Sequence, residues 1–148
     1  MTSMNVKRVS TSSHKSLLPQ AHPIENRPAL IARIRQGESR SRVDEVAGRV
    51  GLTDKETAKI LNLSERSLHR QAADKTLDPN KTERLLLLEE LIQHGLSTFD
   101  ERQDVFARWL RAPRPSLGKV APVSLLDTIA GFGFVDDELS RIEEGMIS

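Results

Sequence analysis

The last 40 residues carry the densest set of signals for where helices begin and end. Pro122 suits the first turn of a helix, because the N–H that proline lacks would have no partner there. Gly131 suits the position just past a helix end. One face of a final helix then follows at the spacing i, i+4 and i+7, formed by Val135, Leu139 and Ile142. Gly145 ends that helix and leaves a three-residue tail. This part of the chain is therefore predicted to be a small helical module.

The composition extends the helical prediction to the whole chain. Apolar residues make up 37% of the 148 residues and aromatic residues only 3%. A core must then be built from Leu, Ile, Val and Ala, and leucine favours helices, whereas runs of the β-branched and aromatic residues that favour strands are scarce. The expected fold class is all-α, with a helix-turn-helix domain followed by a small helical domain.

The charges are distributed unevenly, although the net charge is only +1. Residues 1–49 contain nine Lys or Arg against four Asp or Glu, whereas residues 117–148 contain two against six. A basic N-terminal part suits nucleic acid, and an acidic C-terminal end suits a basic partner surface.

No feature of the sequence indicates export or membrane insertion. There is no cysteine for a disulfide framework, no apolar stretch near the roughly 20 residues that span a bilayer, and no apolar segment of the signal-peptide type. We therefore expect a cytoplasmic protein. Residues 1–23, rich in Ser and Thr and carrying Lys7, Arg8 and Lys15, are expected to form a flexible basic arm.

Two short apolar stripes follow the arm and predict two helices. The first stripe lies within residues 24–36 and contains Ile24, Leu30, Ile31 and Ile34, and it fits a helix that begins near Pro28 and ends at Gly37. The second is closed by Gly51 and contains Val43, Val46 and Val50.

A capping box at Thr53–Glu56 is the clearest local signal, because the Thr hydroxyl and the Glu side chain each satisfy a backbone N–H of the other residue. Asn62 can adopt the left-handed turn conformation, and Ser64 can cap a second helix over residues 65–73. Helix, short turn and helix form a helix-turn-helix pattern, in which the small Ala58 suits the helix crossing and Leu68 faces inward. Gln71 departs from the pattern, since its position is more often apolar.

The start of the second helix is the predicted DNA-contacting surface, since this part of the motif enters the major groove. Arg66 and Arg70 lie four residues apart on one face and can read guanine or bind phosphate. The predicted DNA-binding residues are Lys55, Ser64, Glu65, Arg66, Ser67, His69, Arg70 and Lys75. The basic arm would add salt-dependent affinity.

Asp78-Pro79 opens a longer helix with a broad leucine face. Its apolar residues include Leu85, Leu86, Leu87, Leu88, Leu91 and Ile92. A face this broad is usually buried on more than one side. Core packing explains it as well as a dimer contact does. A second capping box is predicted at Thr98–Glu101, followed by a helix that runs to Leu110 and ends before Pro113.

No group of residues supports catalysis, a metal ion or a cofactor. The four histidines are scattered without metal-ligand spacing, and we expect them to be solvated or associated with helix caps. The segment Gly131-Phe132-Gly133 lacks the features of a phosphate loop and is interpreted as a turn with a buried Phe. The acidic run Asp136–Glu138 is interpreted as the start of a helix, where acidic residues favour the positive end of the dipole.

The C-terminal half contains, in order, Trp109-Leu110, Pro113, Leu117-Gly118, Pro122, Leu125-Leu126-Asp127-Thr128, Gly131, Val135, Leu139, Arg141-Ile142-Glu143 and Gly145. This order resembles the toxin-binding domain of the Xre/MbcA/ParS antitoxins of type II toxin–antitoxin systems, over roughly residues 80–146. The resemblance implies a cognate toxin with a RES domain, similar in fold to ADP-ribosyltransferases and dependent on NAD. It also implies that the terminal helix and tail of the antitoxin block the toxin's active site.

The residues that the resemblance assigns to the toxin-covering surface are Val135, Leu139, Arg141, Ile142, Glu143, Gly145 and Met146. Ile147 and Ser148 are added from their position at the terminus, where a short apolar tail with a carboxylate can enter a cleft that binds an anionic dinucleotide. The expected organisation is an arm over residues 1–23, a DNA-binding and dimerisation domain over 24–95 and a toxin-binding domain over 96–148. Operator DNA and a second copy of the chain are the other expected partners, because helix-turn-helix proteins usually read two half-sites.

Two other classes of function stay open. The chain is alternatively a stand-alone helix-turn-helix transcriptional regulator with a C-terminal protein-interaction module. A small enzyme is the other class, which the absence of any polar catalytic constellation disfavours.

Overall fold

The computed structural model describes residues 27–145, and they form seven α-helices with two short 3-10 helices and no strand. This confirms the all-α prediction. The expected basic arm and the residues Met146, Ile147 and Ser148 lie outside the described residues. The helices are α2 (Arg27–Gln36), α3 (Arg40–Gly48), α4 (Asp54–Ile60), α5 (Glu65–Arg70), α6 (Pro79–Thr98), α7 (Gln103–Arg111) and α8 (Ile129–Glu143), with η3 (Pro115–Leu117) and η4 (Pro122–Leu125) between the last two.

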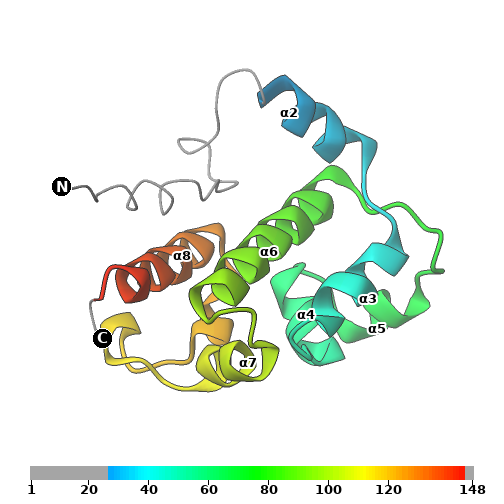
Figure 1. The fold of residues 1–148 in the computed structure, drawn as a ribbon. Helices are drawn as coiled ribbons and strands as arrows, with labels where there is room; N and C mark the ends of the chain where they lie inside the picture. The colour runs from blue at the N-terminus through cyan, green and yellow to red at the C-terminus, as the bar shows by residue number, and fades with distance from the viewer. Residues whose placement is uncertain (1–26, 146–148) are drawn as a thin grey trace.

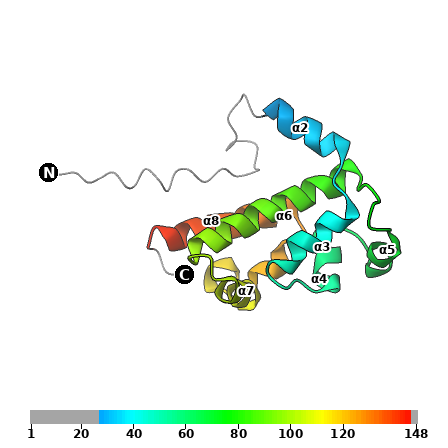
Figure 2. The same cartoon turned by 45° about the vertical axis from the view of Figure 1, so that its right-hand side comes forward.

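The long helix α6 is the centre of the molecule (Figure 1). Helices α3, α4 and α5 gather on one side of it, α8 lies along the other side, and α7 follows its C-terminal end (Figures 1 and 2). Helix α2 projects from the N-terminal end of α6 and has no buried residue. Each half of the chain therefore packs on the same helix.

The broad leucine face of α6 is buried within the chain, as its width predicted. Leu85, Leu88 and Ile92 are almost wholly inaccessible, and Leu86, Leu87 and Leu91 are also buried. One apolar cluster joins these residues, apart from Leu86, to α3 and α4 on one side and to α8 on the other. Because the leucines are already covered, they are not available as the dimer contact that the sequence left open.

Local signals place the starts of the helices in the first half correctly, but the predicted end of the second motif helix at residue 73 is wrong, because α5 ends at Arg70 and Gln71 is extended. Thr53 and Glu56 form both hydrogen bonds of the capping box, and the hydroxyl of Ser64 accepts a hydrogen bond from the backbone N–H of Ser67. Asn62 has a positive φ of 60°, the left-handed conformation expected at the turn. The side chain of Asp78 caps α6 by accepting from the N–H of Lys81.

The second predicted capping box, at Thr98–Glu101, is wrong. Helix α6 continues through Thr98, whose hydroxyl donates to the carbonyl of His94 one turn earlier. Asp100 and Glu101 have positive φ values and form the turn, and α7 begins only at Gln103. Thr98, the predicted cap of a new helix, is therefore the last residue of α6, and Leu96 just before it is buried in the core.

The predicted role of Gly131 as a helix end is also wrong. Pro122 opens only the 3-10 helix η4, whereas Thr128 caps α8 by accepting from the N–H of Gly131. A Cβ at Gly131 would lie 1.7 Å from the carbonyl oxygen of Leu125, so this glycine permits a close backbone approach at the start of α8. Two further interpretations change as a result. Asp136–Glu138 lie in the middle of α8 and not at a helix start. Phe132 is buried as expected, but it belongs to α8 and not to a turn.

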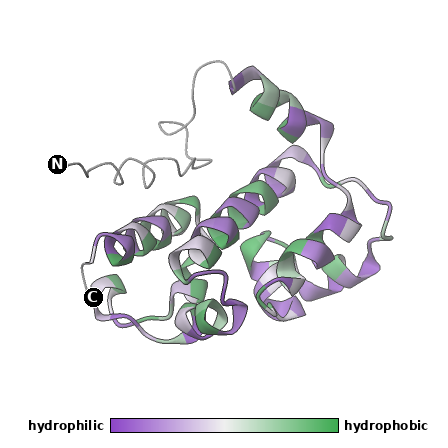
Figure 3. Cartoon of the chain, in the orientation of Figure 1, coloured by the Kyte–Doolittle hydropathy of each residue, from purple (hydrophilic) through white to green (hydrophobic). Residues whose placement is uncertain are grey.

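Figure 3 shows apolar and polar residues on alternate faces of α6, α7 and α8, which is the amphipathic pattern of helices that pack on one another. The projecting α2 differs, since Ile31 is 43% exposed. Among the described residues, no helix has both the length and the apolar character needed to cross a membrane.

Candidate DNA-binding and partner-binding surfaces

Helices α4 and α5 form a helix-turn-helix whose packing face is fully buried. Ala58 of α4, Leu61 at the turn and Leu68 of α5 are each at most 2% exposed. The small side chain of Ala58 lies in this buried face, as the sequence predicted, and Leu68 anchors α5 to the core. The outer face of α5 is thereby held toward solvent.

The predicted DNA-binding residues lie mostly on that outer face. Ser64, Glu65, Arg66, His69 and Arg70 are exposed, as are Lys55 on α4 and Lys75 after α5, whereas Ser67 is half-buried. Neither Arg66 nor Arg70 forms an ion pair or side-chain hydrogen bond within residues 27–145. Two unpaired guanidinium groups on one short helix provide a cationic surface for phosphates or base edges.

His69 contributes to this surface differently from the prediction. Its Nε2 lies 2.7 Å from a carboxylate oxygen of Asp54, the first residue of α4. The pair ties the end of α5 to the start of α4, and it places an acidic group beside the histidine. His69 therefore has a structural partner, and a phosphate contact would have to compete with it.

Arg40 supports the helix-turn-helix from α3, and the sequence did not single it out. Its Nε donates to the carbonyl of Leu68 at 3.1 Å and its Nη1 pairs with Asp44 at 2.9 Å. The backbone N–H groups of Arg40 and Ser41 donate to the carbonyls of Lys75 and Ala73. These contacts fix the segment after α5 against the start of α3, although 28 residues separate Arg40 from Leu68.

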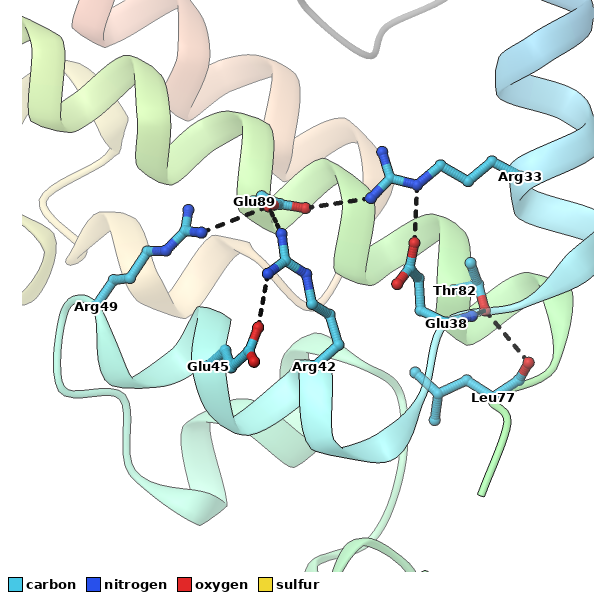
Figure 4. A network of polar contacts seen from close by, with 8 residues as sticks. All are labelled: Arg33, Glu38, Arg42, Glu45, Arg49, Leu77, Thr82 and Glu89. Carbon is cyan, nitrogen blue, oxygen red and sulfur yellow. Dashed lines mark hydrogen bonds and ion pairs between the residues drawn. The ribbon is translucent and has the colours of Figure 1, made fainter. Parts of the chain in front are cut away.

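Glu89 of α6 is the centre of a second polar network, which joins α2 and α3 to α6 (Figure 4). Its buried carboxylate pairs with Arg42, with Arg33 at 3.7 Å and with Arg49 at 3.6 Å. Arg33 also pairs with Glu38, whose backbone N–H donates to Thr82. Three cations around one buried carboxylate satisfy its charge and hold α3 in place on α6.

Two arginines connect the helix-turn-helix to the C-terminal part of the chain. Arg84 of α6 donates to the carbonyls of Ile60 and Asp127, and Arg111 of α7 donates to the carbonyl of Gly51 and pairs with Glu56 at 2.7 Å. The capping residue of α4 is therefore held by α7. These bridges attach the two parts of the chain directly to each other as well as through α6.

Helix α8 turns the predicted toxin-covering face inward. Val135 and Leu139 are 0% exposed and Ile142 packs against the same core. The i, i+4, i+7 stripe is the face that binds α6, because burial of that stripe is what holds α8 in place. The prediction that Val135 and Leu139 contact a toxin directly is thus at odds with their position, and Ile142 is only partly accessible.

The other predicted toxin-binding residues lie nearer to the surface. Arg141 is exposed on the outer face of α8, and Gly145 is exposed with a φ of 85° that ends the helix. The Glu143 carboxylate is instead engaged by α6, where it accepts a 2.7 Å hydrogen bond from Thr98 and lies 3.1 Å from Nε2 of His94.

His94 is a buried histidine at the interface of α6 and α8, contrary to the expectation of a solvated or cap-associated side chain. Its Nδ1 lies 2.6 Å from Asp136 and its Nε2 lies 3.1 Å from Glu143, so each ring nitrogen faces a carboxylate. Burial opposes protonation of the ring, but the hydrogen bonds to Asp136 and Glu143 outweigh it and raise the His94 pKa. Nearby, burial first and then the charge of Asp136 raise the pKa of Glu90 to about 6.

Residues 27–145 contain no cluster of three His, Asp or Glu side chains arranged to hold a metal ion. What they provide is a supported helix-turn-helix with an exposed cationic helix, and a second helical module built from α7, the 3-10 segments and α8. This arrangement defines a helix-turn-helix domain joined to a second helical module.

Comparison with protein families assigns both modules. A family model described as the antitoxin Xre-like helix-turn-helix domain matches residues 29–89, and one described as the antitoxin Xre/MbcA/ParS C-terminal toxin-binding domain matches residues 96–145. Together they leave unmatched only residues 1–28, 90–95 and 146–148. The chain therefore belongs to the Xre/MbcA/ParS family of antitoxins, in agreement with the resemblance seen in the sequence.

Individual relatives extend over nearly the whole chain. The chain is similar to an antitoxin Xre of Photorhabdus laumondii, with 27% identity over 95% of this chain and 99% of that protein. It is similar to a Prs ADP-ribosylating antitoxin of a Sphingobium species, with 28% identity over 86% of this chain and 84% of the relative. An antitoxin Xre of Yersinia enterocolitica is 25% identical over 85% of this chain and 86% of its own length.

Proposed function

We propose that this chain neutralises a cognate RES-domain toxin, which is ADP-ribosyltransferase-like and uses NAD, by covering the toxin's active site with the C-terminal module. The observation that carries the proposal is the match of residues 96–145 to the toxin-binding domain, a segment that folds here as a module on one side of α6. The Sphingobium relative is named a Prs ADP-ribosylating antitoxin, and this name supports a toxin with ADP-ribosylating chemistry. Inhibition is steric and electrostatic, and the chain itself has no catalytic role.

We further propose that the chain represses its own operon through α5 and acts as a homodimer on DNA. The exposed and unpaired Arg66 and Arg70 support operator binding. A dimer follows from the usual reading of two half-sites by helix-turn-helix proteins. Operator binding places the protein in the cytoplasm. Met146, Ile147 and Ser148 lie outside the described residues, and they remain part of the proposed toxin contact.

The test is cellular NAD after induction of the open reading frame next to the gene for this chain, with and without co-expression of this chain. The proposal expects NAD to collapse with the neighbouring product alone and to be preserved when this chain is present. Growth arrest without NAD loss, rescued by this chain, would mean that the toxin modifies a protein target. Absence of any toxicity would favour the alternative function, a stand-alone transcriptional regulator.

A second test separates the two proposed activities. Deleting Gly145 to Ser148 should weaken neutralisation and leave operator binding unchanged. Full protection by the truncated protein would rule out the tail as the part that blocks the toxin.

A further inference from the structure

A groove opens beside α8, on a different face of the helix from the one that Val135 and Leu139 bury against α6. It has a volume of about 430 Å³ and lies between α8 and the segment that carries η3 and η4. Its walls include Leu117 and Leu125 from that segment and Phe134, Asp137 and Arg141 from α8. In Figure 1 the yellow and orange segment before α8 returns beside that helix, which is how the two walls come together.

Phe134 is the unusual residue of this groove. Its exposed fraction is 58%, the largest among the large apolar residues exposed in the described part of the chain. The neighbouring Phe132 and Val135 are buried and already fill the space between α8 and α6. The fold therefore does not use Phe134, and an aromatic side chain left in water beside two leucines is typical of a contact surface.

The charges beside Phe134 give the groove a polar rim. Asp137 and Arg141 lie three and seven residues after Phe134 on α8, and both are exposed. Neither forms an ion pair within residues 27–145. An apolar centre with a rim of unpaired opposite charges has the composition of a protein–protein contact, in which aromatic and Arg side chains supply most of the binding energy.

We infer that this groove is the primary docking surface for the toxin, with Phe134 as its anchor. The inference rests on the proposed function and replaces Val135 and Leu139, which are buried, by a different face of the same helix. All groove residues lie within the segment matched by the toxin-binding domain. The complementary toxin surface presents an apolar side chain to Leu117, Leu125 and Phe134, a cation to Asp137 and a carboxylate to Arg141.

The charges that stay exposed near the groove are of both signs. Residues 117–148 contain six acidic residues, but Asp136 and Glu143 face His94 and Glu138 is buried. Asp137 is the acidic group at the rim of the groove, and it favours a cation on the partner. Arg141 is the basic group at the rim, and its position would set the orientation of the partner.

The experiment measures the dissociation constant of the protein encoded by the neighbouring open reading frame, by isothermal titration of wild type, Phe134→Ser and Ile129→Ser. Ile129 is the matched control, since it lies on α8, is 45% exposed and does not line the groove. The inference expects Phe134→Ser to weaken binding by about 30-fold or more, the effect of losing an aromatic anchor. Ile129→Ser should stay within about threefold of wild type.

Arg141→Glu is a second variant that leaves the apolar groove intact. It should weaken binding by about tenfold, the loss expected when a rim charge opposes its partner. Circular dichroism of each variant checks that the helices are preserved.

The outcomes distinguish the groove from the wider proposal. Tight binding by wild type that Phe134→Ser leaves unchanged overturns the groove and keeps the proposed function. Equal weakening by Phe134→Ser and Ile129→Ser also overturns the groove, because it points to a general effect on α8. No binding by wild type overturns both.

Discussion

Replacement of His94 by leucine removes the residue that joins the two carboxylates of α8 to α6. The imidazole lies 2.6 Å from Asp136 and 3.1 Å from Glu143, and its side chain is 1% exposed. Leucine has a similar volume, so the cavity contribution is small. The main effect is to leave Asp136 and Glu143 without their shared cation, and the charge of Asp136 also acts on the carboxyl of Glu90.

The size of the effect follows from the burial of the partners. Breaking a fully buried ion pair by removing one member costs about 3–5 kcal/mol. The side chains of Asp136 and Glu143 remain 15% and 26% exposed, so water compensates part of the loss. We expect the free energy of unfolding to fall by about 2–3 kcal/mol near pH 6, which shifts a urea midpoint by about 1–2 M.

The effect should depend on pH with a defined sign. The His94 pKa is higher in the folded chain than its ordinary value of 6.5. The stabilisation from the charged ring is therefore fully present below about pH 6.5 and is lost as the pH rises through the folded pKa. The difference in unfolding free energy between wild type and His94→Leu should be largest near pH 6 and should shrink toward pH 9.

Urea denaturation monitored by circular dichroism at several pH values measures this difference. Gln93→Ala, an exposed neighbour on α6, is the control and should change the free energy of unfolding by less than about 0.5 kcal/mol. Adding Asp136→Asn and Glu143→Gln to His94→Leu should restore most of the lost stability, because the uncompensated charges disappear. A difference that stays constant from pH 6 to pH 9 would refute the argument, since it would mean that the ring charge contributes nothing.

Three further predictions concern other parts of the chain. Glu90→Gln should stabilise the protein at pH 7 by roughly 1 kcal/mol after allowance for solvent screening, and the gain should fade as the pH falls from about 6 toward 4.5. Urea denaturation measures this gain, and a destabilised variant would show that Glu90 contributes mainly through attractive contacts. Gly131→Ala should lower the thermal midpoint by several degrees, because the new Cβ would lie 1.7 Å from the Leu125 carbonyl oxygen. Gly48→Ala is the control and should not lower the midpoint, because no atom lies within 4 Å of a Cβ added there. Equal midpoints for the two variants would mean that the start of α8 adjusts freely. Arg66→Ala combined with Arg70→Ala should weaken binding to the operon's own upstream DNA by about tenfold or more and reduce the salt dependence of that binding, while toxin neutralisation persists. Loss of both activities would show that the two modules are not separable.

Local signals predicted much of the first half of the chain. The caps formed by Thr53 and Ser64 and the left-handed turn at Asn62 involve groups only a few residues apart, so their partners are visible in the sequence itself. The width of the leucine face likewise predicted that α6 would be buried on more than one side. The order of prolines, glycines and apolar residues in the last 40 residues sufficed to indicate the antitoxin family.

The candidate site was predicted less well, and the reason differs for each part. Amphipathic spacing correctly grouped Val135, Leu139 and Ile142 on one face, but it does not say whether that face meets the chain's own core or a partner. Helix α6 takes that face, and Phe134 on the other side is left exposed. Gly131 was misplaced because a close approach to Leu125 carries no local signature.

By itself, the sequence determined the helical class, the helix-turn-helix and the exposed arginines of its second helix, because caps, turns and helix periodicity act over a few residues. The tertiary structure alone decided which face of α8 is free, how Glu89 gathers three arginines, and how His94 meets carboxylates 42 and 49 residues away. Such contacts depend on how whole helices pack, and packing is set by the summed burial of many side chains that no local pattern records.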